Sequence, residues 1–164
     1  MKITTIFATL ALSLSGLAHA GPVLCSFQAY DGHYLTAVGG GGRTSDVIHT
    51  DATKVGSWER FELIDLGPSA AGLRRGIRTA SGNYLSAVSA GGRVTDVLHS
   101  NAVSLQEWET FTLVQLSNYE FAIRTYNGHY LTAVNSGGLT QEAIHSDATR
   151  IGTWETFRLK CLRY

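Results

Sequence analysis

The sequence lacks an excess of charge of either sign, long apolar runs beyond its start, and any abundance of cysteine. Its 13 Lys and Arg residues balance 13 Asp and Glu residues. This balance argues against nucleic acid as a partner, because such binding depends on neutralising phosphates. The one basic cluster, Arg74, Arg75 and Arg78, is interpreted as a solvated loop. After residue 20 no apolar run reaches the roughly 20 residues that a membrane-spanning helix needs.

The first twenty residues have the pattern of a secretory signal peptide. Lys2 gives a positive start, residues 3–17 are apolar or small, and Ala18-His19-Ala20 is a small-residue cleavage motif. A membrane anchor is the alternative, but the run is too short to span. We therefore expect residues 1–20 to be removed and residues 21–164 to form one secreted domain, extracellular or periplasmic, with no membrane association after cleavage and as a monomer.

Only two cysteines are present, Cys25 and Cys161, and they lie near the two ends of this domain. An even count in a secreted chain favours a disulfide, and only one pairing exists. Because bridged Cα atoms lie within about 7 Å of each other, such a bond would place the first and last elements side by side.

Three copies of one unit fill the domain. They are marked by "DGHYLTAV", "SGNYLSAV" and "NGHYLTAV", each followed by a glycine-rich turn, and end in "VGSWERF", "LQEWETF" and "IGTWETF". The interval from the Tyr to the Trp is the same in every copy. The copies span approximately residues 25–66, 73–116 and 119–162, and "GPSAAGLRR" carries a four-residue insertion, expected to be a loop.

Each copy reads as four short strands, and no segment has a long apolar period of 3.6 residues. In the third copy the strands are expected at residues 121–125, 130–134, 142–146 and 154–160, with turn residues between them. Three such copies with joined ends predict an all-β, twelve-stranded β-trefoil with pseudo-threefold symmetry, since a three-bladed propeller would be unusually small.

The string G-x-Y-L-x-A-V followed by W-E-x-F-x-L resembles the fascin-like β-trefoils, over essentially all of Cys25 to Tyr164. It is more similar to secreted modules of carbohydrate-binding module family 92. Fascins are cytosolic actin cross-linkers with four trefoils, so their function does not transfer. The family 92 resemblance implies three sites for β-1,3- and β-1,6-linked glucans, each using a Trp and a Glu. In this chain those residues are Trp58, Glu59, Trp108, Glu109, Trp154 and Glu155.

Strand alternation separates the residues of these segments. In "WETFTL", Glu109, Phe111 and Leu113 share one face, and Trp108 and the two threonines share the other. Phe111 and Leu113 are expected inside the barrel, which leaves Trp108 outside at the mouth of its strand. An aromatic residue exposed three times suggests a ligand, and a pyranose ring stacks well on a flat aromatic face. The alternative is that the Trp residues pack against the hairpin layer that closes the barrel.

The role of the glutamates is open between two interpretations. Each carboxylate either accepts hydrogen bonds from sugar hydroxyls or ties down the adjoining turn through backbone N–H groups. The tyrosines of the "YL" pairs, Tyr34, Tyr84 and Tyr130, are expected to be partly buried, with a second stacking wall as the alternative.

Two further sets of polar residues recur at equivalent positions. A histidine in each copy suits a polar rim near the Trp or a turn hydrogen bond better than a zinc site, because closely spaced histidine pairs are lacking. An Asp or Asn two residues later either joins that rim or starts a turn. The histidines are His49, His99 and His145, and the residues after them are Asp51, Asn101 and Asp147.

The sequence indicates a binding protein rather than an enzyme. It has no Ser or Cys nucleophile motif, and glycoside hydrolysis needs two carboxylates about one bond. We expect a lectin-like protein with three similar weak sites for a β-glucan-type polysaccharide, and no cofactor or metal. The second copy, with Asn101 and Gln106-Glu107, departs most and is the one expected to be altered. The alternative function is a secreted effector or inhibitor that binds protein through residues 67–75.

Overall fold

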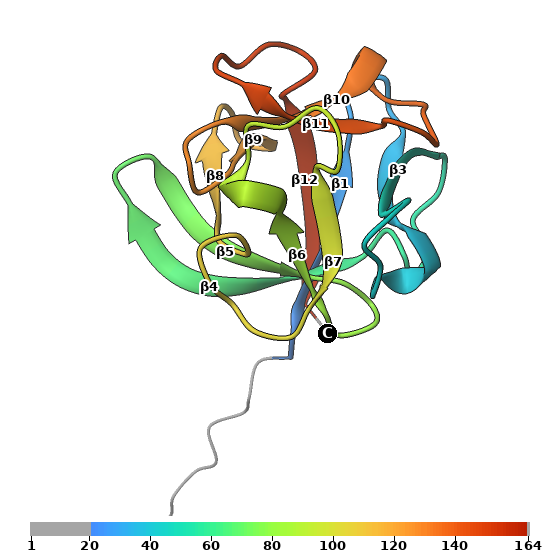
Figure 1. Ribbon diagram of the computed structural model, residues 1–164, viewed down its shortest axis with the longest axis horizontal. Coiled ribbons are helices and arrows are strands. Elements are labelled where there is room, and N and C mark those ends of the chain that lie inside the picture. The colour runs from blue at the N-terminus through green and yellow to red at the C-terminus, as the bar shows by residue number, and fades with distance from the viewer. Residues whose placement is uncertain (1–20, 164) are drawn as a thin grey trace, which may run out of the picture.

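The computed structural model describes residues 21–163, which form twelve β-strands and three single-turn 3₁₀ helices (Figure 1). The predicted signal peptide, residues 1–20, lies outside the described residues. None of the helices in the described part is long and apolar enough to cross a membrane. The strands are β1 (Val23–Gln28), β2 (Tyr34–Ala37), β3 (Ile48–Ala52), β4 (Phe61–Ser69), β5 (Gly72–Arg78), β6 (Tyr84–Ala87), β7 (Leu98–Ala102), β8 (Phe111–Gln115), β9 (Glu120–Arg124), β10 (Tyr130–Ala133), β11 (Ile144–Ala148) and β12 (Phe157–Arg163). The helices are η1 (Val38–Gly40), η2 (Val88–Ala90) and η3 (Val134–Ser136).

Six strands pair in a closed antiparallel ring, in the order β1, β4, β5, β8, β9, β12 and back to β1. The other six form the hairpins β2–β3, β6–β7 and β10–β11, each attached to a barrel strand of its own repeat. A six-stranded barrel with three hairpins in threefold arrangement is a β-trefoil, which confirms the predicted fold class.

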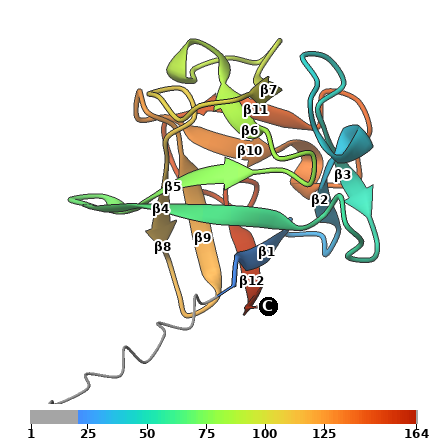
Figure 2. The same cartoon turned by 90° about the horizontal axis from the view of Figure 1, so that it is seen from below.

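The two ends of the domain are joined. Strands β1 and β12 run side by side (Figures 1 and 2). They form six residue pairs, of which the first is Val23 with Arg163. Within this pair Cys25 and Cys161 form the predicted disulfide, with their Cα atoms 4.0 Å apart. The disulfide therefore closes the barrel between its first and last strands.

The barrel interior is filled by the same positions of each repeat. Phe61, Phe111 and Phe157, the phenylalanines of the Trp segments, are completely buried, as the strand alternation predicted. Phe27 joins them, and its ring lies edge-on to that of Phe61 with centroids 5.6 Å apart. The leucines of the "YL" pairs belong to the same core, so each repeat contributes apolar side chains to it.

Backbone hydrogen bonds join each repeat to the next in a complete cycle. The Gly42 N–H donates to the Ser100 carbonyl (2.8 Å), and the Ser100 N–H donates back to the Arg43 carbonyl (2.8 Å). The same reciprocal pair links the second repeat to the third. It then links the third to the first, where Gly138 donates to Thr50 (2.7 Å).

The four-residue insertion lengthens a hairpin instead of forming an irregular loop. Strand β4 continues to Ser69 and β5 begins at Gly72, so only Ala70 and Ala71 remain for the turn. The pairing shifts between Asp65 and Pro68, which is where the two strands absorb the irregularity. The resulting hairpin projects from the barrel (Figures 1 and 2).

Candidate functional site

The three tryptophans lie in turns directly before β4, β8 and β12, and not in the strands themselves. Strand β12 begins at Phe157, so the sequence-based start at residue 154 is wrong by three residues. The expectation that the rings lie outside the barrel holds: Trp58 is 47%, Trp108 46% and Trp154 42% exposed. Rings so exposed are not buried beneath the hairpin layer, which weakens the packing alternative.

Each tryptophan turn is anchored to the hairpin of its own repeat by the same backbone contact. The Trp58 carbonyl accepts a hydrogen bond from the Ala37 N–H (2.9 Å), at the end of β2. The equivalent bonds join Ala87 to Trp108 (2.7 Å) and Ala133 to Trp154 (2.8 Å). The backbone position of each tryptophan is thus set by the fold.

The glutamates after the tryptophans are held inside the protein. One carboxylate oxygen of Glu59 accepts a hydrogen bond from the Thr36 hydroxyl (2.8 Å), and the other accepts one from the Gly56 N–H (2.7 Å). Glu109 bonds the Ser86 hydroxyl and the Gln106 N–H (3.1 Å) in the same way. Only 8% of Glu59 and of Glu109 is exposed.

The third copy repeats this arrangement in a more open setting. Glu155 accepts hydrogen bonds from the Thr132 hydroxyl (2.7 Å) and the Gly152 N–H (2.8 Å), and it is half-buried. In all three copies the carboxylate therefore bridges the hairpin and the loop before the tryptophan. Of the two interpretations left open by the sequence, this geometry favours the carboxylate that ties down the turn.

The indole of Trp58 lies along the 3₁₀ helix of its repeat. A methyl group added to Gly40 would lie 3.3 Å from the indole Nε1 and 3.4 Å from Cδ1. Gly40 belongs to a run of four residues with positive φ, 39–42, which recurs at 89–92 and 135–138. This backbone explains the glycine-rich turns, because positive φ strains residues with a side chain. One edge of the ring is therefore packed, and nearly half of the side chain remains open to solvent.

The histidines act within their own turns in two of the three copies. His49 Nε2 lies 2.7 Å from the Asp46 carboxylate, and His99 Nε2 lies 2.8 Å from that of Asp96. The turn hydrogen bond is therefore the alternative that the structure supports for these two. His145, at the equivalent place, has Glu142 three residues before it. No group of three or more His, Cys, Asp or Glu within residues 21–163 is arranged to hold a metal ion.

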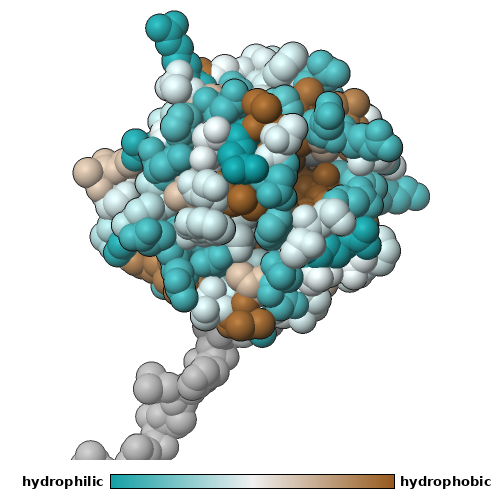
Figure 3. Space-filling view, in the orientation of Figure 1, coloured by the Kyte–Doolittle hydropathy of each residue, from teal (hydrophilic) through white to brown (hydrophobic). Residues whose placement is uncertain are grey.

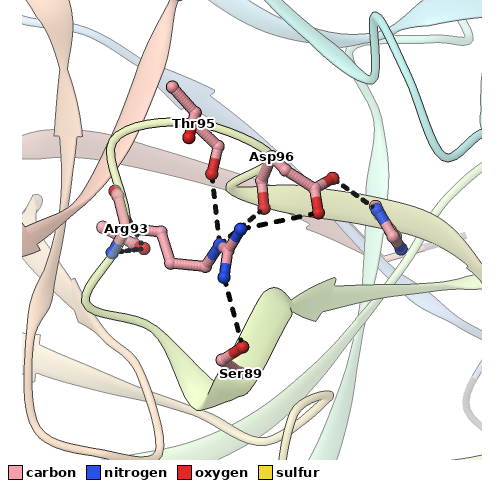
Figure 4. A network of polar contacts seen from close by, with 6 residues as sticks. Ser89, Arg93, Thr95 and Asp96 are labelled. Atoms are coloured by element: carbon pink, nitrogen blue, oxygen red, sulfur yellow. Dashed lines mark hydrogen bonds and ion pairs between the residues drawn. The ribbon is translucent and has the colours of Figure 1, made fainter.

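The loops that carry these acidic residues surround a hollow of about 560 Å³. Its floor includes Ile48, Leu98 and Ile144, one from each repeat. Figure 4 shows how the second repeat holds its rim: the Arg93 guanidinium donates to the carbonyls of Thr95 (3.1 Å) and Asp96 (3.2 Å). None of the three tryptophans lines this hollow.

The residues two places after the histidines stand exposed on the third strand of each repeat. Asp51, Asn101 and Asp147 all lie one residue before the end of β3, β7 and β11. Because these side chains are exposed, a ligand lying over the strands could contact them. Their role in a polar rim stays a prediction.

The "YL" tyrosines Tyr34, Tyr84 and Tyr130 are half-buried, as expected. Tyr34 lines a hollow of about 350 Å³ together with Tyr119 and Arg158, on the side of β1 and β12. Sequence reasoning missed Tyr126, whose hydroxyl reaches the Glu107 carboxylate beside Trp108. The hydrogen bond to Glu107, reinforced by the charge of that carboxylate, raises the pKa of Tyr126. The sequence did contain a signal for Tyr126. The residue before each "DG", "SG" or "NG" turn is Tyr30, Ala80 or Tyr126, so two of the three copies have a tyrosine there.

The second tryptophan also borders a hollow of its own, of about 430 Å³. It is lined by Trp108, Glu107, Gln106 and the almost fully exposed Val103 (85%). Figure 3 shows that apolar areas on the face in view are small and separated by polar surface.

Comparison with known proteins supports the fold and goes no further. No protein-family model matches the sequence, and no curated protein is similar enough to indicate a relationship. Among solved structures, the designed threefold-symmetric protein ThreeFoil has a TM-score of 0.67 at 15% identity, covering 83% of this chain and 96% of its own. The β-trefoil BEL has a TM-score of 0.65 at 13% identity, with 87% and 95% covered. The Rhizoctonia solani agglutinin has a TM-score of 0.64 at 14% identity, with 85% and 94% covered. This chain is thus similar in fold to β-trefoil proteins.

Proposed function

We propose that this protein is a secreted, non-catalytic, lectin-like β-trefoil that binds a β-glucan-type polysaccharide through three tryptophan sites. The observation that carries the proposal is the threefold exposure of a positioned indole. Trp58, Trp108 and Trp154 are each 42–47% exposed, and their backbones are fixed by the same hydrogen bonds. Stability alone does not require an exposed aromatic ring three times.

The exposed part of each indole sets the strength expected of one site. A Trp side chain offers roughly 250 Å², so an exposure of 42–47% leaves about 110 Å² to be covered. At about 25 cal/mol per Å², covering it contributes about 3 kcal/mol, which corresponds to weak, millimolar-range binding. Three such sites on one polymer chain raise the overall affinity by about 10² to 10⁴ when linked geometry allows simultaneous binding.

Within this proposal the glutamates have a positioning role, which their hydrogen bonds support. Since both oxygens of each carboxylate already accept hydrogen bonds, Glu59, Glu109 and Glu155 hold the turn that presents the ring. Polar contacts to sugar hydroxyls then come from exposed neighbours, which include Ser57 and Glu107.

A pull-down with insoluble β-1,3- and β-1,6-glucan tests the proposal. The triple variant Trp58→Ala, Trp108→Ala, Trp154→Ala should lose binding, while single variants keep part of it. Tyr119→Ala is the matched control, because Tyr119 is an exposed aromatic residue (72%) outside the tryptophan turns. Circular dichroism must show that every variant is folded. Retention of glucan binding by a folded triple variant would refute the proposal.

The projecting β4–β5 hairpin favours one other function, binding to a protein. Leu73 is 43% exposed there, and Arg74 beside it is exposed as well. A double variant, Leu73→Ser with Arg74→Ser, leaves the tryptophan turns intact. If this variant keeps glucan binding, the hairpin is separate from the sugar sites; if it alone loses a protein partner found in cell extracts, the second function gains support.

A further inference from the structure

Each tryptophan turn lies beside the beginning of the next repeat. The Ser81 N–H donates to the Gly40 carbonyl (2.8 Å), and the equivalent bond joins the Asn127 N–H to Ala90 (3.2 Å). The third such bond closes the ring, from the Asp31 N–H to the Ser136 carbonyl (3.2 Å). The residue before each of these donors therefore lies near the tryptophan turn of the preceding repeat. These residues are Ala80, Tyr126 and Tyr30.

The first repeat shows how close this neighbourhood is. A methyl group on Gly40 would lie 3.4 Å from Cδ1 of Trp58 and 3.7 Å from Cβ of Ala80. Residue 80 and the indole therefore both lie close to Gly40 of η1. Because the hydrogen bonds repeat, residue 126 has this place beside Trp108, and residue 30 has it beside Trp154.

These three equivalent positions do not hold the same residue. Tyr126 is 55% exposed and Tyr30 is 52% exposed, whereas the first site has only the Ala80 methyl group. Around Ala80 there is instead a hollow of about 350 Å³, lined by Ser57, Arg60 and Arg78 among others. The first site therefore has one aromatic surface, and the other two have a second one.

In the second site the tyrosine has a neighbour in the tryptophan turn. Glu107, the residue immediately before Trp108, raises the pKa of Tyr126 through a side-chain hydrogen bond and its charge, which places the two side chains near each other. More than half of the surface of Tyr126 stays open to solvent. Glu107 has Ser57 and Thr153 as its equivalents, so this orientation is a feature of the second site.

We propose that the three sites are unequal, and that Tyr126 and Tyr30 are second stacking residues for sugar in the Trp108 and Trp154 sites. This inference rests on the proposed sugar-binding function. A chain of at least two linked pyranose rings contacts both aromatic side chains in these sites, while the Trp58 site holds a single ring. The changes in the second copy at residues 103 and 107 thus add contact groups, and the first copy is the weakest site.

Nuclear magnetic resonance of the indole N–H groups tests each site separately in the intact protein. The chain has three tryptophans, so three indole signals report the three sites, and single Trp→Phe variants assign them. The titrant is a β-1,3-linked glucose tetrasaccharide. We expect the Trp108 and Trp154 signals to reach half-saturation at about tenfold lower concentration than the Trp58 signal, which corresponds to about 1.4 kcal/mol. With glucose alone the three midpoints should be similar.

Two substitutions exchange the character of the sites. Tyr126→Ala should move the Trp108 midpoint to that of Trp58 and leave the Trp154 midpoint unchanged. Ala80→Tyr should shift the Trp58 midpoint toward those of the other two, and Tyr119→Ala should shift none of the three.

The outcomes separate the two levels of the proposal. If no indole signal responds to the sugar and the protein is not retained on glucan, the sugar-binding function fails, and the inequality of sites fails with it. If all three signals respond with one common midpoint that Tyr126→Ala does not change, sugar binding stands and only the inequality is overturned.

Discussion

Replacing Glu59 with alanine should destabilise the fold more than it directly weakens contact with a ligand. The change removes two hydrogen bonds to a carboxylate, one from the Thr36 hydroxyl and one from the Gly56 N–H. Bonds to charged groups contribute roughly 1.5–3 kcal/mol each. Part of this is regained, because Gly56 is exposed and can bond water, whereas the buried Thr36 hydroxyl loses its partner. We expect a net loss of about 3 kcal/mol in the free energy of unfolding.

Thermal denaturation followed by intrinsic fluorescence measures this loss. For a domain of this size about 3 kcal/mol corresponds to a fall in Tm of roughly 10 °C. Glu59→Gln keeps one oxygen as an acceptor and should lose about half as much. Glu62→Ala is the control, because its contact with Arg78 (3.1 Å) is a partly exposed ion pair that contributes less than about 1 kcal/mol.

The same variants distinguish a positioning carboxylate from one that contacts sugar. If Glu59 holds the turn, Glu59→Gln lowers Tm but keeps most of the glucan binding well below the transition. The reasoning is refuted if Glu59→Ala melts within about 2 °C of the unchanged protein and loses binding at the Trp58 site alone.

Three other measurements test separate parts of the structure. Ser89 is exposed and has a φ of 57°, a conformation that favours glycine, and the first repeat has glycine at this position. Ser89→Gly should therefore raise the free energy of unfolding by about 0.5–1 kcal/mol. A fall in Tm would contradict this. Glu107→Gln should lower the pKa of Tyr126 toward its ordinary value, because the Glu107 carboxylate favours the protonated phenol. The pKa is measured from the tyrosine Cζ signals in nuclear magnetic resonance spectra recorded against pH. An unchanged pKa would show that Glu107 is not the partner of Tyr126. Replacing both Cys25 and Cys161 with serine should lower the free energy of unfolding by about 4 kcal/mol, because the disulfide joins residues with a sequence separation of 136. Urea denaturation measures the loss. An unchanged midpoint would show that the pairing of the two strands is sufficient without the disulfide.

The sequence was sufficient for the fold because its repeats have a constant spacing and alternate in polarity where the backbone is extended. Phe111 and Leu113 could be placed in the core for this reason, and both are buried. The same alternation put Trp108 on the outer face and Glu109 on the face of Phe111. The ring is indeed exposed and the glutamate buried, although both residues lie in the turn before the strand. The role of the carboxylate was left open, because its hydroxyl partner, that of Ser86, lies on another strand 23 residues earlier in the chain.

The alternation of side chains along a strand could not predict which residues of neighbouring repeats come into contact. Tyr126 lies near Glu107 because the fold brings the beginning of the third repeat beside η2. Nothing in the spacing within one repeat indicates that neighbour. The insertion shows the same limit, because Gly67 and Pro68 signal a break in structure, yet their neighbours continue the strand pairing of β4 with β5.

The cycle of backbone hydrogen bonds between repeats has a consequence for how the molecule comes apart. In linear repeat proteins the terminal units have a single neighbour and open first. Here every repeat exchanges hydrogen bonds with two others, as Thr50 of the first does with residues 138 and 139 of the third. No repeat occupies an end, so fraying has no preferred starting unit. Chain ends moved to the turn at Asn118, with the original ends joined, should leave this cycle intact and give a protein that still unfolds in one cooperative step.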